Sequence, residues 1–503
     1  MKKKDLTRVF SVFAAAAVVT SLGACNEAVV TETDSTTEST EVTESKTAVI
    51  SKDNIVINSE MSSTEDSEHV IEVDGETKEY SNVKVTKSGD SGEGDEADFY
   101  GDNSAIFATN GATLSLDEVI IDTDGTHANA IFSYGEGTTV NISDSVITTS
   151  GNCSGGLMTT GGGTMNATNL SVHTTGNSSA AIRSDRGGGT VTVTGGEYVT
   201  DGTGSPAIYS TADITVNDAD LTSTASQGVV VEGQNSVTLN NVDLTADNNT
   251  KNSDKSDYYQ AVMIYQSMSG DADEGTASFT MSVGSVTNKN GDIFFVNNTV
   301  ADINLTDVQI INQNENGVFL RAEAAGWGSD GTNGGNVNLT ISDQVLEGDM
   351  VIDEISGLNF YLNDDSSYFG TINGENEGNV YVEIEDGSTW DLTGDSYIDA
   401  LTCGENAIRL NGHKLYVNGV EYKEGSASSG SEVEFIVSTG EHGGFGDMGK
   451  PEDGGAPDGN GGTPPERPEG EGGPKMDGNT PPEKPDGNGG PDGDGKTPPA
   501  KPE

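Results

Sequence analysis

The chain has 503 residues, of which 32% are hydrophobic and 67 are glycine, and its formal net charge at pH 7 is −58. So low an apolar content is lean for one compact globule and usual for stacked short strands joined by glycine-rich turns. A charge this negative repels phosphate backbones and argues against nucleic-acid binding. The same charge attracts hard cations, above all Ca²⁺, whose preferred ligands are carboxylate oxygens. Solubility alone is the simpler interpretation of the charge.

The first 24 residues have the parts of a secretion signal. Three lysines and Arg8 form a positively charged start, and the apolar stretch Val9–Val19 that follows is too short to span a membrane. The next segment, Leu22-Gly23-Ala24-Cys25, resembles the lipobox of bacterial lipoproteins. The resemblance implies cleavage before Cys25 and a lipid on that residue, which would anchor the secreted protein on the extracellular face of the bacterial membrane. The alternative is ordinary secretory cleavage beside a cysteine present by chance.

Both ends of the remaining chain have compositions that cannot bury a core. Residues 25–47 are rich in Ser, Thr and Glu and are expected to form a tether. From residue 443 the chain is rich in Gly, Pro and Asp, and the hexapeptide that begins at Thr463 recurs in similar form at Thr480 and Thr497. This 17-residue repeat predicts an extended, disordered tail over residues 443–503.

Residues 48–442 contain a repeat of short strands with a period in the twenties. Each unit begins with a small residue and two larger ones, and the central residues of the first six units are 25, 26, 25, 26 and 21 positions apart. A second strand with strict alternation, such as Val140-Asn141-Ile142, and a short third strand, such as Val146-Ile147-Thr148, complete a unit. The central residues are Ile106, Ile131, Leu157, Ile182, Ile208, Val229 and, after longer loops, Val262, Ile293 and Val318.

Three short strands per unit, repeated in register, predict an all-β solenoid, a parallel β-helix of about ten rungs. A single rung cannot bury its own apolar face, so neighbouring rungs must stack. A leucine-rich repeat is excluded because the units lack its leucine pattern and have no room for a helix. A β-sandwich is excluded because the alignment repeats in register too many times. A right-handed coil is expected from the usual handedness of parallel connections.

The repeat and the segments that close it resemble a known family. The Ala-Ile-aromatic rungs, the Gly/Thr turns and the segments Trp390–Tyr397 and Gly412–Gly419 are similar to adhesin-like right-handed β-helix proteins of anaerobic Gram-positive bacteria. The resemblance covers roughly residues 48–439 and is specific for the fold rather than for a ligand. It implies a pectate-lyase-like fold, and some relatives are calcium-containing binders of cellulose and pectin. No binding residue is carried over, because no site motif matches.

The parity of the first strand of each rung predicts an outer surface. If the central residue faces inward, the next residue faces outward, and Arg183 at such a position supports the assignment because burying an unpaired charge is costly. The outward positions form an aromatic column on which sugar rings could stack. Its candidate ligand-binding residues are Phe107, Phe132, Tyr209, Phe294 and Phe319. An alternative of nearly equal weight is that terminal segments, a loop or another subunit cover the column.

Two loop insertions, residues 269–275 and 323–330, leave the solenoid at the same corner, two rungs apart. Two rungs correspond to about 10 Å, so the acidic residues of both loops are candidate Ca²⁺ ligands, and Trp327 is a candidate stacking face for a sugar. The candidate metal ligands are Asp271, Asp273, Glu274 and Asp330. The alternative is that these solvated loops bind nothing. A third insertion, Asp247–Gln260, is expected at a different corner and carries two tyrosines.

Pectate-lyase-like enzymes share this fold, so catalysis has to be tested on the residues. A lyase of that kind uses Arg or Lys as a base beside Ca²⁺-binding carboxylates, and Arg183-Ser184-Asp185-Arg186 is the one local basic cluster. A solvated ion pair between Arg186 and Asp185 is the simpler interpretation. His127, His173 and His413 lie in different rungs without a nucleophile motif. The sequence therefore assigns no catalytic residue.

The two cysteines of the solenoid lie far apart. Cys153 and Cys403 are about eight rungs from each other, well beyond the ~7 Å between Cα atoms that a disulfide allows. We therefore expect no bridge between them. With no histidine near either residue in the sequence, we also expect no zinc site.

These features favour a cell-surface lipoprotein that binds a polysaccharide such as cellulose or pectin without cleaving it, with Ca²⁺ as a bridge if the sugar is anionic. One alternative is a polysaccharide lyase or hydrolase of the same fold. Another is a protein-binding adhesin or surface spacer, for which the aromatic column would be a protein–protein face. The expected partners are a polysaccharide and, through the lipid on Cys25, the membrane.

Overall fold

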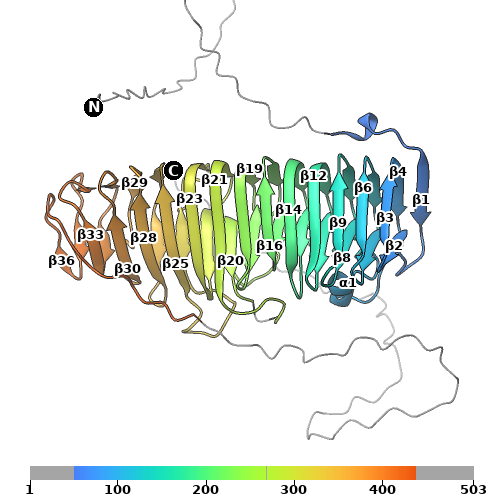
Figure 1. Ribbon diagram of the computed structural model, residues 1–503. Helices are drawn as coiled ribbons and strands as arrows, with labels where there is room; N and C mark the ends of the chain where they lie inside the picture. Colours follow the sequence, from blue (N-terminus) through green and yellow to red (C-terminus); the bar gives the residue numbers. More distant parts are fainter. Residues whose placement is uncertain (1–49, 268, 438–503) are drawn as a thin grey trace, which may run out of the picture. The chain divides into compact units, whose positions relative to one another are not determined.

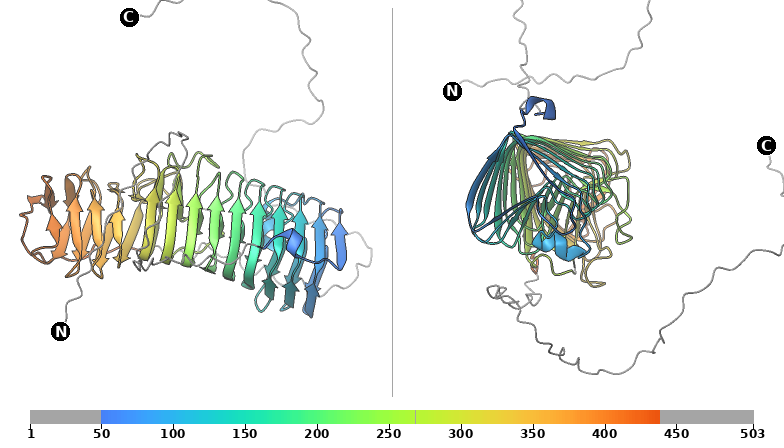
Figure 2. Two further views of the ribbon diagram at one scale, coloured as in Figure 1. Left: turned by 90° about the horizontal axis from the view of Figure 1, so that it is seen from above. Right: turned by 90° about the vertical axis from the view of Figure 1, so that its right-hand side faces the viewer.

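The computed structural model describes residues 50–267 and 269–437 of the chain. The predicted signal peptide, the lipid attachment at Cys25, the tether and the C-terminal tail lie outside the described residues. Within the described ranges the chain is a parallel β-helix, as predicted. Its rungs stack along one axis (Figure 1), and the right-hand view of Figure 2 looks along that axis.

Two long parallel sheets form most of the wall. The smaller one takes the first strand of each successive rung and has 11 strands, close to the ten rungs expected. Its strands pair in chain order. They are β2 (Ile71–Asp74), β5 (Ile106–Thr109), β8 (Ile131–Tyr134), β11 (Leu157–Thr160), β13 (Ile182–Ser184), β15 (Ile208–Ser210), β18 (Val229–Glu232), β20 (Gln260–Tyr265), β22 (Asp292–Asn297), β24 (Leu320–Ala322) and β27 (Met350–Ile352).

The larger sheet has 18 strands and is built from the second and third strands of the rungs. In several rungs these two merge into one long strand that continues through a left-handed residue, such as Asn169 with φ 54°. The strands are β1 (Ser59–Ser63), β3 (Thr77–Ser81), β4 (Val83–Lys87), β6 (Thr113–Asp117), β7 (Ile120–Thr123), β9 (Thr139–Ser143), β10 (Val146–Thr149), β12 (Gly163–Thr174), β14 (Gly189–Thr200), β16 (Asp213–Asn217), β17 (Asp220–Ser223), β19 (Ser236–Ala246), β21 (Thr276–Asn288), β23 (Thr299–Asn312), β25 (Gly335–Ser342), β28 (Gly357–Asn363), β30 (Asn379–Ile384) and β33 (Ala400–Cys403).

Two small sheets complete the C-terminal rungs. One contains β26 (Val345–Glu347), β29 (Ser367–Gly370), β31 (Thr389–Leu392) and β34 (Ile408–Arg409), and the other contains β32 (Ser396–Ile398), β35 (Leu415–Val417) and β36 (Val420–Glu421). Strand β36 pairs antiparallel with β35 and is the last strand of this three-stranded sheet.

The helical content of the described residues is small. A 3₁₀ turn, η1 (Lys52–Asn54), precedes β1, and one helix, α1 (Asp95–Tyr100), lies between β4 and β5. No helix in the described ranges is long and apolar enough to cross a membrane.

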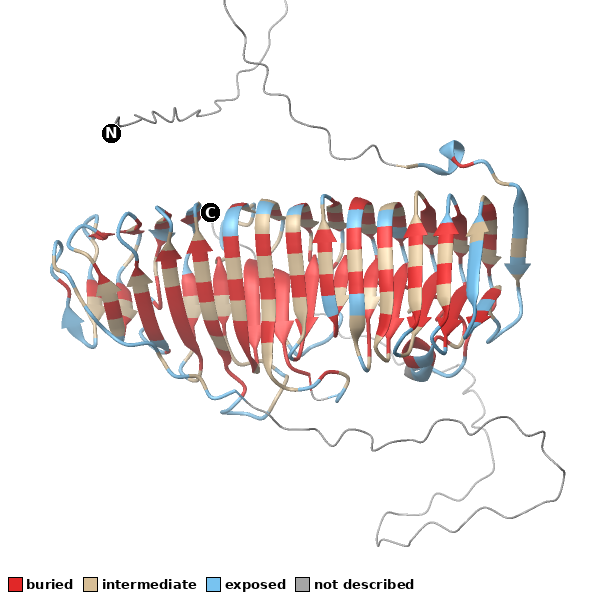
Figure 3. Cartoon of the chain, in the orientation of Figure 1, coloured by how far each residue is buried: buried red, intermediate tan, exposed pale blue. Residues whose placement is uncertain are grey.

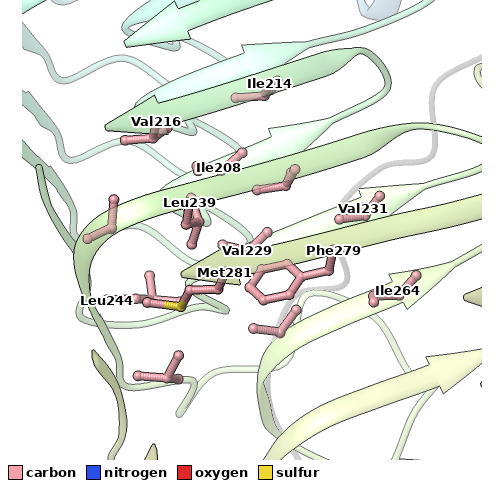
Figure 4. Close-up of a cluster of buried hydrophobic side chains, with 14 of the residues drawn as sticks. Ile208, Ile214, Val216, Val229, Val231, Leu239, Leu244, Ile264, Phe279 and Met281 are labelled. Atoms are coloured by element: carbon pink, nitrogen blue, oxygen red, sulfur yellow. The ribbon is translucent and has the colours of Figure 1, made fainter. Parts of the chain in front are cut away.

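The interior is filled by the aliphatic column predicted from the sequence. From Ile106 to Val262 the central residues pair with one another along the 11-stranded sheet and are fully buried in one continuous core. Buried and partly exposed residues alternate along the 18-stranded sheet (Figure 3), as the period-2 pattern requires. In Figure 4, Ile208 and Val229 lie in the same interior as Phe279 and Met281 of the opposite sheet.

Beyond Val262 the predicted inward column is wrong, by one residue at Ile293 and by two residues at Val318. Strand β20 pairs with β22 through Val262 and Phe294, and β22 pairs with β24 through Phe294 and Leu320. Phe294 therefore points inward and Phe295 outward, and Phe319 packs against Phe294 in the core with ring centroids 5.5 Å apart. Ile293–Val296 in β22 are four apolar residues in succession, and Val318–Leu320 at the start of β24 are three, so alternation does not determine parity. A slip of one residue moves a side chain to the other face.

Serines connect the turns that precede the 11-stranded sheet. The hydroxyl of Ser154 accepts a hydrogen bond from the N–H of Ala128, and the hydroxyl of Ser179 accepts one from the N–H of Ser154, each at 2.9 Å. The Ser179 hydroxyl also donates to the carbonyl oxygen of Gly151 at 3.1 Å, and Ser205 repeats the pattern one rung later. Because these serines are fully buried, their hydroxyls replace water as partners of the turn backbone.

Helix α1 packs on the outer face of the 11-stranded sheet near β8 (Figure 1). Gly101 ends the helix in the left-handed conformation, φ 78°, and its N–H donates to the carbonyl oxygen of Ala97 at 2.9 Å. A Cβ on Gly101 would also lie 2.7 Å from the ring of Phe107, so both the backbone and the close packing require glycine. Thr160 of β11 donates to the carbonyl oxygen of Phe99 at 2.7 Å. The helix is thus a fixed cover on the sheet.

Replacing Ser179 by Ala should lower the free energy of unfolding by about 1–3 kcal/mol, because the buried N–H of Ser154 loses its acceptor. Denaturant unfolding followed by circular dichroism measures the change. The control is Ser62→Ala, at an exposed serine of β1, which should shift stability by less than about 0.5 kcal/mol. Equal small effects of both substitutions would show that the serines do not stabilise the turns.

Candidate functional site: a groove on the 11-stranded sheet

A groove lies on the outer face of the 11-stranded sheet, over β13, β15, β18 and β20. Helix α1 borders one end, and the loops between β19 and β20, between β20 and β21, and between β24 and β25 border the rest. One half is charged and the other is aromatic, and we call the whole the sheet groove. The residues common to both halves are Gly204, Pro206, Tyr209 and Asn252.

The N-terminal part of the predicted aromatic column is covered rather than exposed. Phe107, Phe132 and Met158 form a small apolar cluster of their own, and Phe132 and Met158 are fully buried. Helix α1 closes over the two phenylalanines at Gly101, and the ring of His69 stacks on Phe107 with centroids 4.5 Å apart. Here the alternative of a covered column holds, and neither phenylalanine presents a ring face to a sugar.

The aromatic half of the groove lies toward the C-terminus. Trp327 packs edge-on against Tyr265, with ring centroids 5.2 Å apart. The guanidinium of Arg321 lies 3.9 Å from the ring centroid of Tyr258, a cation–π contact that fixes this ring. The aromatic lining consists of Tyr209, Tyr258, Tyr259, Tyr265 and Trp327.

Two of the insertions recognised in the sequence meet at this half. The N–H of Gly326 donates to the carbonyl oxygen of Lys255 at 2.7 Å, and the Lys255 ammonium lies 5.6 Å from the ring centroid of Trp327. The insertion Asp247–Gln260, expected at a different corner, therefore closes against the Trp327 loop and brings its tyrosines to the groove. Of the six predicted ligand-binding residues, Trp327 and Tyr209 line the sheet groove.

A buried carboxylate fixes two of the tyrosines. Glu232, which is 1% exposed, accepts hydrogen bonds from the hydroxyls of Tyr209 and of Tyr265, the latter at 2.8 Å. Burial raises the pKa of both tyrosines well above its usual value, and the Glu232 carboxylate adds to the shift. The hydroxyls therefore stay protonated and donate to Glu232, which holds both rings in place.

The charged half of the groove is organised by Arg183. One guanidinium nitrogen lies 3.1 Å from Asp98 and the other 2.8 Å from Asp185. Burial alone would lower the pKa of Arg183, but the two carboxylates outweigh it and raise the pKa. Arg183 therefore keeps its proton and is unsuited to act as the base that a lyase requires.

The pKa of Asp185 is raised, whereas that of Asp98 in the same half of the groove is lowered. Burial raises the pKa of Asp185 to about 6, and the carboxylates of Asp271 and Asp98 act in the same direction. The Arg183 guanidinium opposes this rise in the pKa of Asp185, but it also pairs with Asp98. Two buried carboxyl groups therefore share one guanidinium. The predicted side-chain ion pair between Arg186 and Asp185 was wrong, because the Arg186 guanidinium contacts Asp271 instead.

The four predicted Ca²⁺ ligands do not form one site. Asp271 accepts two hydrogen bonds from the Arg186 guanidinium, at 3.2 and 3.0 Å. Asp273 and Asp330 are exposed, and Glu274 lines a second hollow, which it shares with the neighbouring Trp327 loop. The two loops adjoin, as expected from their positions in the repeat. Their carboxylates do not gather as a metal-ligand set within the described ranges.

Of the predictions made for the two cysteines, one is confirmed and one is wrong. Neither Cys153 nor Cys403 forms a disulfide in the described part of the chain. The expectation that no histidine lies near Cys153 was wrong. Potential ligand atoms of Asp98, His127 and Cys153 all lie within 4.8 Å of one another.

Comparisons of the chain with protein-family models, with curated proteins and with solved structures find no match. The resemblance described above therefore rests on the rung and closing motifs alone.

The raised pKa of Asp185 predicts a pH dependence of stability. The folded state binds this proton more tightly than the unfolded chain, so the contribution is complete below about pH 4 and is lost as the pH rises through about 6. Asp185→Asn cannot titrate and should remove a decline of about 2–3 kcal/mol across this window. Denaturant unfolding at several pH values measures it. Asp273→Asn, at an exposed carboxylate, should keep the decline, and an unchanged slope in Asp185→Asn would contradict the assignment.

Proposed function

We propose that the protein is a cell-surface lipoprotein that binds a polysaccharide through the sheet groove without cleaving it. The observation that carries the proposal is the lining of the groove, where aromatic rings lie beside amide, hydroxyl and charged groups on a rigid sheet. Sugar rings have apolar faces and polar edges, and a site that fits them combines aromatic faces with hydrogen-bonding groups. Because the groove extends over several stacked strands, it suits an extended chain such as cellulose or pectin.

Calcium has a defined part in this proposal only for an anionic sugar. The chain and a pectin-like polymer are both negative, so their surfaces repel unless a cation lies between them. Asp271 is already bound by Arg186. We therefore propose that Ca²⁺ bridges the sugar to exposed carboxylates such as Asp273 and Asp330, rather than occupying a closed site made by all four predicted ligands.

Retention of the full chain on insoluble cellulose and on a polygalacturonate gel tests both statements. We expect retention on at least one of the two. Retention on polygalacturonate should require Ca²⁺ and be lost with a chelator, whereas retention on cellulose should not change. Absence of retention on both supports, with and without Ca²⁺, would reject these ligands and favour the protein-binding adhesin or spacer.

Replacing Trp327 by Ala should weaken binding by about tenfold, since one aromatic stacking face is worth roughly 1.4 kcal/mol. Tyr416→Ala is the matched control, because Tyr416 stacks on Tyr397 at the C-terminal end, outside the sheet groove. Depletion of soluble protein by the polysaccharide gives both affinities. A Trp327→Ala variant that binds like the control would place the sugar elsewhere.

A hydrolase is the second candidate, and the pKa of Asp185 favours it. A carboxyl group that titrates near pH 6 can donate a proton to a leaving sugar oxygen, and Asp271 lies on the same half of the groove. Release of reducing ends that is lost in Asp185→Asn would establish this activity. An unsaturated product absorbing in the ultraviolet would instead indicate a lyase. Binding without either product supports the non-catalytic function.

A further inference from the structure

A column of left-handed turn residues runs beside the 11-stranded sheet. His127, Cys153 and Ser178 occupy the same turn position in three successive rungs, with φ of 56°, 54° and 55°. The N–H of His127 donates to the carbonyl oxygen of Asn152 at 3.0 Å, and the N–H of Cys153 donates to that of Asn177 at 2.8 Å. The side chains of His127 and Cys153 are therefore neighbours one rung apart, held by the backbone ladder.

Helix α1 adds a third group to this pair. Asp98 is 3% exposed, and its Oδ1 lies 3.1 Å from Nδ1 of His127, which is 7% exposed. Asn129 also donates to Oδ1, at 3.3 Å. A carboxylate, an imidazole and a thiol from three separate segments thus converge under the helix, and the ligand atoms of the three side chains lie within 4.8 Å of one another.

We propose that Asp98, His127 and Cys153 bind a Zn²⁺ ion. A tetrahedral zinc ion with bonds of about 2.0–2.3 Å needs ligand atoms about 3.3–3.8 Å apart, so a pair of these ligand atoms has to close by about 1.5 Å at most. Thiolate and imidazole are the ligands that favour Zn²⁺ over the hard ion Ca²⁺. The site is separate from the proposed Ca²⁺ bridge and does not depend on the proposed function.

The surrounding charges suit a divalent ion. Arg183 binds the other oxygen of Asp98 at 3.1 Å, which orients the carboxylate and leaves Oδ1 directed at His127. Arg183 also binds Asp185. With a thiolate at Cys153, the negative charges are those of Cys153, Asp98 and Asp185. Arg183 together with one divalent cation balances these three charges. The ion would connect α1 to two rungs of the solenoid and hold the helix at the end of the sheet groove.

Cobalt titration of the full chain tests the site, because Co²⁺ replaces Zn²⁺ and reports thiolate ligation by a charge-transfer band in the near ultraviolet. Excess Ca²⁺ in the buffer occupies weak carboxylate sites on this acidic protein. We expect a band that saturates at a single ion per chain and is displaced by Zn²⁺. Cys153→Ser should abolish it, and Asp98→Asn should weaken Co²⁺ binding by more than about tenfold.

Two cysteine variants are the controls. Cys403 is buried beside the Tyr422 hydroxyl, and Cys25 lies outside the described residues, so Cys403→Ser and Cys25→Ser should both keep the band. A band that survives in Cys153→Ser, or no band in the unmodified chain, would overturn the proposal and leave a hydrogen-bonded trio.

A second measurement needs no variant. Zn²⁺ should slow alkylation of Cys153 in the unmodified chain by more than about tenfold, measured on the Cys153 peptide by mass spectrometry. The Cys403 peptide is the internal reference. An alkylation rate of Cys153 that does not change with Zn²⁺ would contradict the site even if the variants failed to fold.

Discussion

The backbone hydrogen bonds between parallel strands set both the spacing and the register of successive rungs. Adjacent strands lie about 4.8 Å apart, so residues at equivalent positions stack in columns whatever their chemistry. This constraint produces the aliphatic core, and it also aligns Ser154 with Ser179 at the turns and His127 with Cys153 beside them. The core, the turns and the floor of the sheet groove are therefore columns of one repeat.

The same constraint explains how much the sequence could predict. Alignment placed the inward residues correctly from Ile106 to Val262, where rungs first recur every 25 or 26 residues and then after 21 and 33. It failed at Phe294 and Phe319, where longer loops interrupt the period and apolar runs of four and three residues hide the parity. Arg321 pairs with Phe295 of the neighbouring strand. Because a charged side chain is expected to face outward, Arg321 could have indicated that Phe295 faces outward as well. His127 and Cys153 are 26 residues apart, one rung, and that spacing also was a usable signal.

The cover on the sheet and the walls of the groove were not predictable in this way. Helix α1 has six residues and no repeat partner, so nothing in its composition shows that it closes over Phe107. The insertion that carries Tyr258 meets the Trp327 loop through a few single contacts, among them the backbone hydrogen bond from Gly326 to Lys255. Periodicity describes what repeats, whereas these contacts are made by segments that occur once. The floor of the sheet groove is therefore formed by repeating strands, and its walls are formed by segments that occur once in the chain.

The antiparallel strand at the C-terminal end has a consequence for assembly. A stack of parallel rungs presents unpaired N–H and carbonyl groups at its last strand, and such an edge is a template on which another copy can add. Here β36 turns back onto β35, and Tyr422 just after it packs against the core. A strand that runs antiparallel to its neighbour does not continue a parallel ladder. This edge of the three-stranded sheet therefore offers another copy no parallel strand to extend.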